Sequence, residues 1–196
     1  AFDALAAALP RLPETPKRLP PILWPWLQWT AARAPAADLL LYLLGDRPPQ
    51  QLIPHLSLMS PWARGRVANQ LGAAASDPAA REALFALLAD RGSDARDEAF
   101  KALSAAAIRP ADAPQLEAYL SRGNSDTRRA ALSLLAGQPA GAALASADRL
   151  LAARDEAARL GGLELLGLLA RDGKGGDAPA RAAAYRAAHP TLSPAE

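Results

Sequence analysis

The sequence repeats itself at an interval of about 32 residues. The segment RGSDARDEAFKAL (91–103) is followed by GNSDTRRAALSLL (123–135), so that Arg96 aligns with Arg128. The same spacing reaches back to Arg64 and forward to Arg159, and these four residues are called the ladder arginines. A fixed period of this length is the signature of a repeat architecture, so it constrains the fold more than any other feature of the chain.

Residues at fixed offsets from the ladder arginines are apolar or small. The residues seven positions later are Leu71, Leu103, Leu135 and Leu166, and those three or four positions later are Val67, Ala68, Ala99, Phe100, Ala131, Leu132, Gly162 and Leu163. Offsets of three, four and seven trace one face of a helix. Two columns upstream predict a second helix in each unit: Leu52, Leu84, Leu116 and Ala147, and Leu56, Leu88, Leu120 and Leu151. Each unit is therefore expected to be a pair of helices.

The apolar composition favours helices over strands. The chain contains 50 Ala but only one Val, three Ile and four Thr. Ala is the best helix former, whereas β-branched residues favour strands. The composition and the periodicity together predict an all-α chain.

Local signals predict where the helices begin and end. Ser60-Pro61 and Asp77-Pro78 each offer an N-cap followed by proline at the first helical position. Ser93 and Ser125 are expected to cap the second helices of their units. Gly92 and Gly123 are expected at helix ends that require a positive φ.

A helical hairpin with one apolar face cannot bury that face alone, whereas stacked hairpins share a continuous core. The expected fold is therefore a right-handed α-α superhelix, a solenoid of about five helical hairpins. An irregular capping region is expected over 1–47, with its first helices at 22–34 and 36–45, and the repeats over 48–170. A Gly-rich linker, a short capping helix and a tail are expected over 171–196.

The repeats resemble the HEAT-like family, the α-solenoid relatives of armadillo proteins. The residues that carry the resemblance are Asp94-Ala95-Arg96, Ala99 and Leu103, then Asp126-Thr127-Arg128, Ala131 and Leu135, and more weakly 155–159. The interval is shorter than the ~40–47 residues of ordinary HEAT units and is closer to the short bacterial variety. The resemblance implies a solenoid whose second helices line a concave, partner-binding face.

The ladder arginines have two interpretations. They could form a basic ladder for phosphates or for an acidic partner. Alternatively, each could pair with an aspartate of a neighbouring turn (Asp94, Asp126 or Asp155) and tie units together. The resemblance favours the structural interpretation, because pairing of this kind is the usual role of the matching arginine.

Positions one, two and five after each ladder arginine face away from the predicted core. The residues expected there to bind a partner are Arg66, Asn69, Lys101, Arg129, Ser133 and Glu164. This row mixes positive and negative charges, whereas a nucleic-acid groove is expected to carry one sign. The row therefore counts against a nucleic-acid groove, and a solvated surface without a function stays open as the alternative to a partner-binding face.

Aromatic side chains gather near the N-terminus. Trp24, Trp26 and Trp29 lie within six residues, and Trp62 follows on a later helix. Tryptophan is enriched at binding hot spots, but large rings can equally seal the end of an alanine-rich stack. Capping is the favoured interpretation, with partner binding as the alternative.

The sequence is poorly equipped for catalysis or metal binding. It has no cysteine and only two histidines, His55 and His189, and His55 falls in a core column where a half-buried side chain is expected. DGKGGD (172–177) lacks the spacing of a phosphate-binding loop and is expected to be a flexible link. No catalytic residues, metal or cofactor are expected.

The expected function is that of a non-enzymatic scaffold or adaptor, which binds another protein or another domain of a longer chain. Binding to a nucleic-acid backbone is the alternative. A HEAT-type DNA glycosylase is a distant third, because tryptophan is absent from the central second helices. The longest aliphatic run, LLLYLL (39–44), is too short to span a membrane, and Asp3 argues against a secretory signal. A bacterial, cytoplasmic protein is expected.

Overall fold

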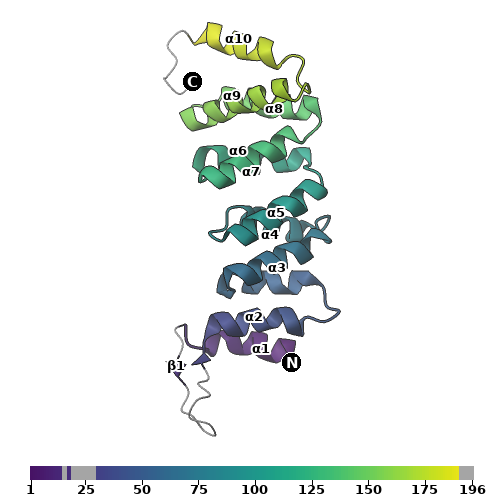
Figure 1. Cartoon of the computed structure of the whole chain (residues 1–196), viewed down its shortest axis with the longest axis vertical. Coiled ribbons are helices and arrows are strands. Elements are labelled where there is room, and N and C mark those ends of the chain that lie inside the picture. The colour runs from purple at the N-terminus through teal and green to yellow at the C-terminus, as the bar shows by residue number, and fades with distance from the viewer. Residues whose placement is uncertain (15–16, 19–29, 190–196) are drawn as a thin grey trace. The chain divides into compact units, whose positions relative to one another are not determined.

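The computed structural model describes residues 1–14, 17–18 and 30–189. Apart from one pair of two-residue strands, the elements in these ranges are helices (Figure 1), and the all-α prediction is confirmed. The chain forms two compact units, Ala1–Ala102 and Leu103–Glu196. Within each unit, helices that follow one another in sequence pack together, as expected of a helical-repeat fold.

The first unit begins with short elements and ends with longer helices. Its elements are α1 (Phe2–Ala8), η1 (Leu9–Arg11), β1 (Lys17–Arg18), β2 (Thr30–Ala31), α2 (Arg33–Leu43), η2 (Pro49–Leu58), α3 (Pro61–Gly72), α4 (Pro78–Leu88) and most of α5 (Ser93–Ala105). The helix α2 packs on α1 and η2, and α3 packs on η2 and α4.

The second unit is a stack of consecutive helices. Its elements are the end of α5, η3 (Pro110–Asp112), α6 (Ala113–Arg122), α7 (Ser125–Ala136), α8 (Ala140–Leu151), α9 (Glu156–Arg171) and α10 (Ala178–Ala188). The helix α9 is central to this unit because it packs on α6, α7, α8 and α10.

The core follows the repeat columns. The four leucines seven positions after the ladder arginines are all buried, as are Val67, Ala99 and Ala131 three positions after them. The upstream leucines Leu52, Leu84 and Leu116 are also fully buried. The two helix faces predicted from periodicity are therefore the faces that form the core.

Two of the four predicted capping residues are confirmed, and the other two are wrong. Ser60 accepts a hydrogen bond from the Ala63 amide, and Asp77 accepts one from the Ala80 amide, so both predicted N-caps are confirmed. Ser93 and Ser125 are instead the first residues of α5 and α7, and Asn124 is the cap of α7. The side-chain oxygen of Asn124 accepts from the amides of Asp126 and Thr127, which leaves Ser125 no capping role.

The prediction of positive φ at Gly92 and Gly123 is wrong. Among the residues described, the glycines with positive φ are Gly45 and Gly173. Gly92 and Gly123 are required for space instead: a Cβ on Gly92 would lie 2.7 Å from Cβ of Pro61, and one on Gly123 would lie 2.5 Å from the Tyr119 carbonyl oxygen.

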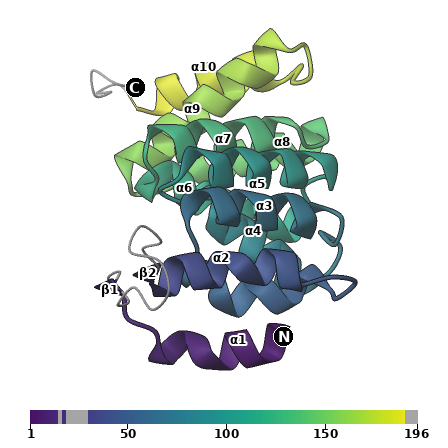
Figure 2. The ribbon, with the colours of Figure 1, turned by 60° about the horizontal axis from the view of Figure 1, so that its bottom comes forward.

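The N-terminal hairpin also differs from the prediction. A helix was expected over 22–34, but Thr30–Ala31 is a strand that pairs antiparallel with Lys17–Arg18. The partner of α2 is α1, which runs alongside it in Figure 2 and buries Phe2. The Arg33 guanidinium at the start of α2 donates to the Leu12 carbonyl, which fastens the chain between the two helices.

The helix before α3 is a 3₁₀-helix rather than an α-helix. Pro49 opens it and Pro54 lies inside it. Because proline lacks an amide hydrogen and clashes with the preceding turn, an α-helix is disfavoured over this segment. His55 is half-buried, as expected, with its ring edge-on to Phe2 at a centroid distance of 6.5 Å.

Candidate functional site

The ladder arginines bind backbone carbonyls at the end of the preceding helix or in the turn that follows it. Arg64 donates to the Met59 carbonyl at 2.6 Å, Arg96 to the Asp90 and Arg91 carbonyls, Arg128 to the Leu120 carbonyl, and Arg159 to the Arg154 carbonyl at 2.8 Å. Carbonyls at a helix end have no partner within the helix, and the guanidinium groups donate to carbonyls at these ends or in the turns that follow.

Arg64 makes a bidentate ion pair with Asp90. Its Nε and Nη2 atoms lie 2.7 and 2.8 Å from the two carboxylate oxygens, and both side chains are mostly buried. Burial alone would raise the pKa of Asp90, but hydrogen bonds from Arg64 and from the Gly92 amide outweigh it and lower that pKa below its ordinary value. The pair ties the start of α3 to the end of α4.

The aspartates proposed to pair with the ladder arginines have other roles. Asp155 caps α9 by accepting from the Ala158 amide, and Asp94 accepts from the Ser93 hydroxyl. Asp126 lies 3.7 Å from Arg129 in an exposed ion pair. The expected pairing is therefore wrong for Asp94 and Asp155, because carboxylates at helix starts are drawn to amides and hydroxyls of their own first turns. The carboxylates that two ladder arginines bind are Asp90 and Glu164.

The predicted partner-binding residues are all exposed, and five of the six line two separate depressions. Arg66 and Asn69 line one in the first unit, whereas Arg129, Ser133 and Glu164 line the other in the second unit. The sixth, Lys101, is paired with Glu98 at 2.7 Å and lines neither.

The depression in the first unit is small. It has a volume of about 220 Å³ and lies between α3 and α5. Trp62 lines it with half of its surface exposed, and the Asn69 amide donates to Glu98 across it at 3.0 Å. A hydrogen bond from the Lys101 ammonium, together with this one from Asn69, lowers the pKa of Glu98 below its ordinary value.

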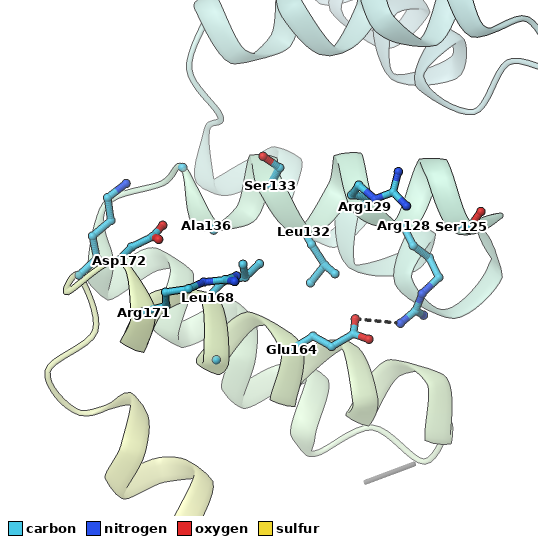
Figure 3. A pocket seen from close by; sticks show the side chains of 13 residues that line it. Ser125, Arg128, Arg129, Leu132, Ser133, Ala136, Glu164, Leu168, Arg171 and Asp172 are labelled. Carbon is cyan, nitrogen blue, oxygen red and sulfur yellow. Dashed lines mark hydrogen bonds and ion pairs between the residues drawn. The ribbon is translucent and has the colours of Figure 1, made fainter.

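The depression in the second unit is a groove between α7 and α9 with a volume of about 1140 Å³. It is called the α7–α9 groove below. Its lining residues are Ser125, Arg128, Arg129, Leu132, Ser133, Ala136, Gly137, Glu164, Gly167, Leu168, Arg171, Asp172 and Lys174. Figure 3 shows Leu132 and Leu168 between the two helices, with Arg128 and Glu164 toward one end and Asp172 at the other.

The floor of the groove is apolar and open. Leu132 and Leu168 are only half-buried. Gly167 lies in the middle of α9, where nothing comes within 4 Å of the Cβ that another residue would place there. The neighbouring glycines differ, because a Cβ on Gly161 or Gly162 would lie 3.0–3.1 Å from leucine side chains. Close packing therefore explains Gly161 and Gly162 but not Gly167.

The charges of the groove are paired at one end only. Arg128 binds Glu164 at 3.1 Å. Within the part of the chain that the structure describes, neither Arg171 nor Lys174 has a side-chain hydrogen bond or ion pair. Both side chains are exposed. The end of the groove at the C-terminus of α9 therefore carries two cations that are available to a ligand.

Several groove residues were missed by the sequence analysis. Leu132 was placed in a core column, and Lys174 was placed in a flexible link. The missed signal is a stripe at every fourth position, which includes Leu132 and Ala136 on α7 and Gly167 and Arg171 on α9. On each helix, these residues lie beside the face that forms the core.

The remaining candidates of the sequence analysis add no site within the described ranges. Trp24, Trp26 and Trp29 lie outside the described residues. Among the residues that are described, no group of three or more His, Asp or Glu side chains could hold a metal ion. In the same part of the chain, no helix is long and apolar enough to cross a membrane.

Comparison with known families gives one match. The profile of a family described as "Family of unknown function (DUF5724)" matches residues 1–189. No curated protein and no solved structure matches the chain.

Proposed function

Since the chain belongs to DUF5724, a family of unknown function, we propose from its geometry that it is a non-enzymatic helical-repeat module that binds a polypeptide segment. The segment lies in the α7–α9 groove and belongs to another protein or to another domain of a longer chain. Binding rests on complementarity to a preformed surface rather than on chemistry.

The open apolar floor is the observation that carries this proposal. Leu132 and Leu168 are half-buried within the groove, although the core around α9 is otherwise closely packed. Gly167 costs α9 about 1 kcal/mol relative to alanine and gains no packing contact in return. A ligand side chain that fills the space beside Gly167 explains both features.

The resemblance to HEAT-like repeats supports the same conclusion. Both helices that form the groove are second helices of their units, which is the position from which HEAT-like proteins bind partners. The alternative, a nucleic-acid backbone, is less well supported because Glu164 and Asp172 lie among the cations of the groove.

Selection from a displayed library of random linear peptides tests the proposal. Gly167→Leu fills the groove and suits a helix better than glycine, so the fold is retained. Gly141→Leu is the matched control, because Gly141 lies in α8 outside the groove and also has open space at its Cβ. We expect peptides to be enriched on the wild type and on Gly141→Leu but not on Gly167→Leu. Equal enrichment on all three would contradict binding in the groove.

Titration with a labelled DNA oligonucleotide tests the alternative function, which is binding to a nucleic-acid backbone. A backbone-binding protein loses affinity steeply as salt rises. We expect no saturable binding at physiological salt. Tight, salt-sensitive binding that Gly167→Leu leaves intact would favour the nucleic-acid interpretation.

A further inference from the structure

Resting on the proposed function, we infer that the segment bound in the α7–α9 groove is acidic. It places an apolar side chain on Leu132 and Leu168 and at least one carboxylate against Arg171 and Lys174. The partner is thus a peptide whose carboxylates lie beside an apolar anchor.

Charge complementarity at the end of α9 carries this inference. Four cationic side chains line the groove against two carboxylates. Arg128 is used by Glu164 and by the Leu120 carbonyl, and Arg129 lies beside Asp126. Arg171 and Lys174 have no such partner among the described residues. A ligand carboxylate would accept hydrogen bonds from these two side chains, which have no acceptor within the second unit. The planar guanidinium of Arg171 can bind both oxygens of such a carboxylate.

The position of Lys174 is fixed by the turn that ends α9. Gly173 adopts a φ of +65°, which favours glycine. The amides of Lys174 and Gly175 then both donate to the Leu169 carbonyl, at 3.1 and 3.2 Å. The segment that was expected to be a flexible link is therefore a defined cap that holds Lys174 at the groove.

The helix dipole explains only part of this arrangement. Arg171 lies in the last turn of α9, where a cation is stabilised by the negative end of the helix. Lys174 lies beyond that turn and needs a different explanation. Asp172 adds one carboxylate at the same end, and the two cations outnumber it.

A second peptide selection tests the inference. The variant Arg171→Glu with Lys174→Glu reverses both charges. Its matched control is Arg122→Glu with Arg186→Glu, which makes the same change of net charge at the last turns of α6 and α10, outside the groove. Thermal melting followed by circular dichroism confirms that each variant is folded. The best wild-type peptide is also titrated, beside a version with Asn and Gln in place of Asp and Glu.

We expect the wild type and the control to enrich peptides that carry Asp or Glu beside a large apolar residue. Neutralising those carboxylates should weaken binding about 3- to 30-fold, the range for two exposed charge pairs. The groove variant should lose the acidic preference. Enrichment without acidic residues, or the same acidic preference in the groove variant, would overturn the inference while the proposed function stands. If the wild type enriched peptides no more than Gly167→Leu does, the proposed function itself would be contradicted.

Discussion

At the scale of single residues, the ladder arginines act within the fold. Arg159 illustrates the pattern: it donates to the Arg154 carbonyl and to the hydroxyl of Tyr185, which is buried on α10. It therefore joins the turn after α8 to both α9 and α10. Hydrogen bonds from charged groups to such acceptors are worth about 1.5–3 kcal/mol each when one partner is removed.

Arg128 and Arg129 provide a direct test of this role, because they are neighbours with different environments. Arg128→Ala removes the bonds to Leu120 and Glu164 and should lower the free energy of unfolding by about 1–3 kcal/mol. Arg129→Ala should change it by less than about 0.5 kcal/mol, because that side chain is 80% exposed. Urea unfolding measures both. Equal effects of the two substitutions would contradict a structural role specific to the ladder.

The Arg64–Asp90 pair predicts how stability depends on pH. The pKa of Asp90 is lowered in the folded protein, so the folded state holds the proton less tightly than the unfolded chain. Its contribution is therefore complete above about pH 5 and is lost as the pH falls through the folded-state pKa. Asp90→Asn should reduce the loss of stability between about pH 5 and pH 2.

Urea unfolding at a series of pH values measures this dependence, with Asp46→Asn as the exposed control. The control should retain the wild-type pH profile. An unchanged profile in Asp90→Asn would show that the pair does not couple folding to protonation.

At the scale of elements, the surroundings of a glycine show whether it is needed for close packing. Gly123 lies where a helix ends against the Tyr119 carbonyl, whereas Gly167 lies within α9 with open space around it. We expect Gly123→Ala to destabilise the protein by about 1–3 kcal/mol through the clash. Gly167→Ala should stabilise it by about 0.5–1 kcal/mol through helix propensity. Melting temperatures that shift in the same direction for both would contradict this distinction.

The helices from α3 onward could be predicted from the sequence because their signals are local and periodic. The leucine columns identify the core face, and Ser60 and Asp77 identify helix starts. The N-terminal region could not be predicted in the same way. The packing of α1 depends on contacts between residues far apart in the sequence, such as the Arg47–Asp3 ion pair at 2.8 Å, which joins α1 to the turn after α2.

The groove was only partly predictable. Arg129, Ser133 and Glu164 were identified because they lie opposite the core columns. Leu132 was not, because an apolar residue beside a core column has the same pattern whether it is packed or open. Lys174 depends on the backbone conformation of Gly173, which no periodic signal reveals.

At the scale of the whole molecule, we place the proposed binding in one unit. The α7–α9 groove is built entirely from residues of Leu103–Glu196. The formal charge of the chain is only +2, so long-range attraction to polyanions is weak and local complementarity must supply specificity. The central claim is therefore that a peptide occupies the space beside Gly167.

Fluorescence anisotropy titration of one selected peptide against wild type, Gly141→Leu and Gly167→Leu tests that claim most directly. The wild type and Gly141→Leu should bind with the same Kd. Gly167→Leu should bind at least about tenfold more weakly, because the leucine fills the space that the apolar side chain of the peptide would occupy. This variant should melt no lower than the wild type. Equal affinity in all three proteins would contradict the account.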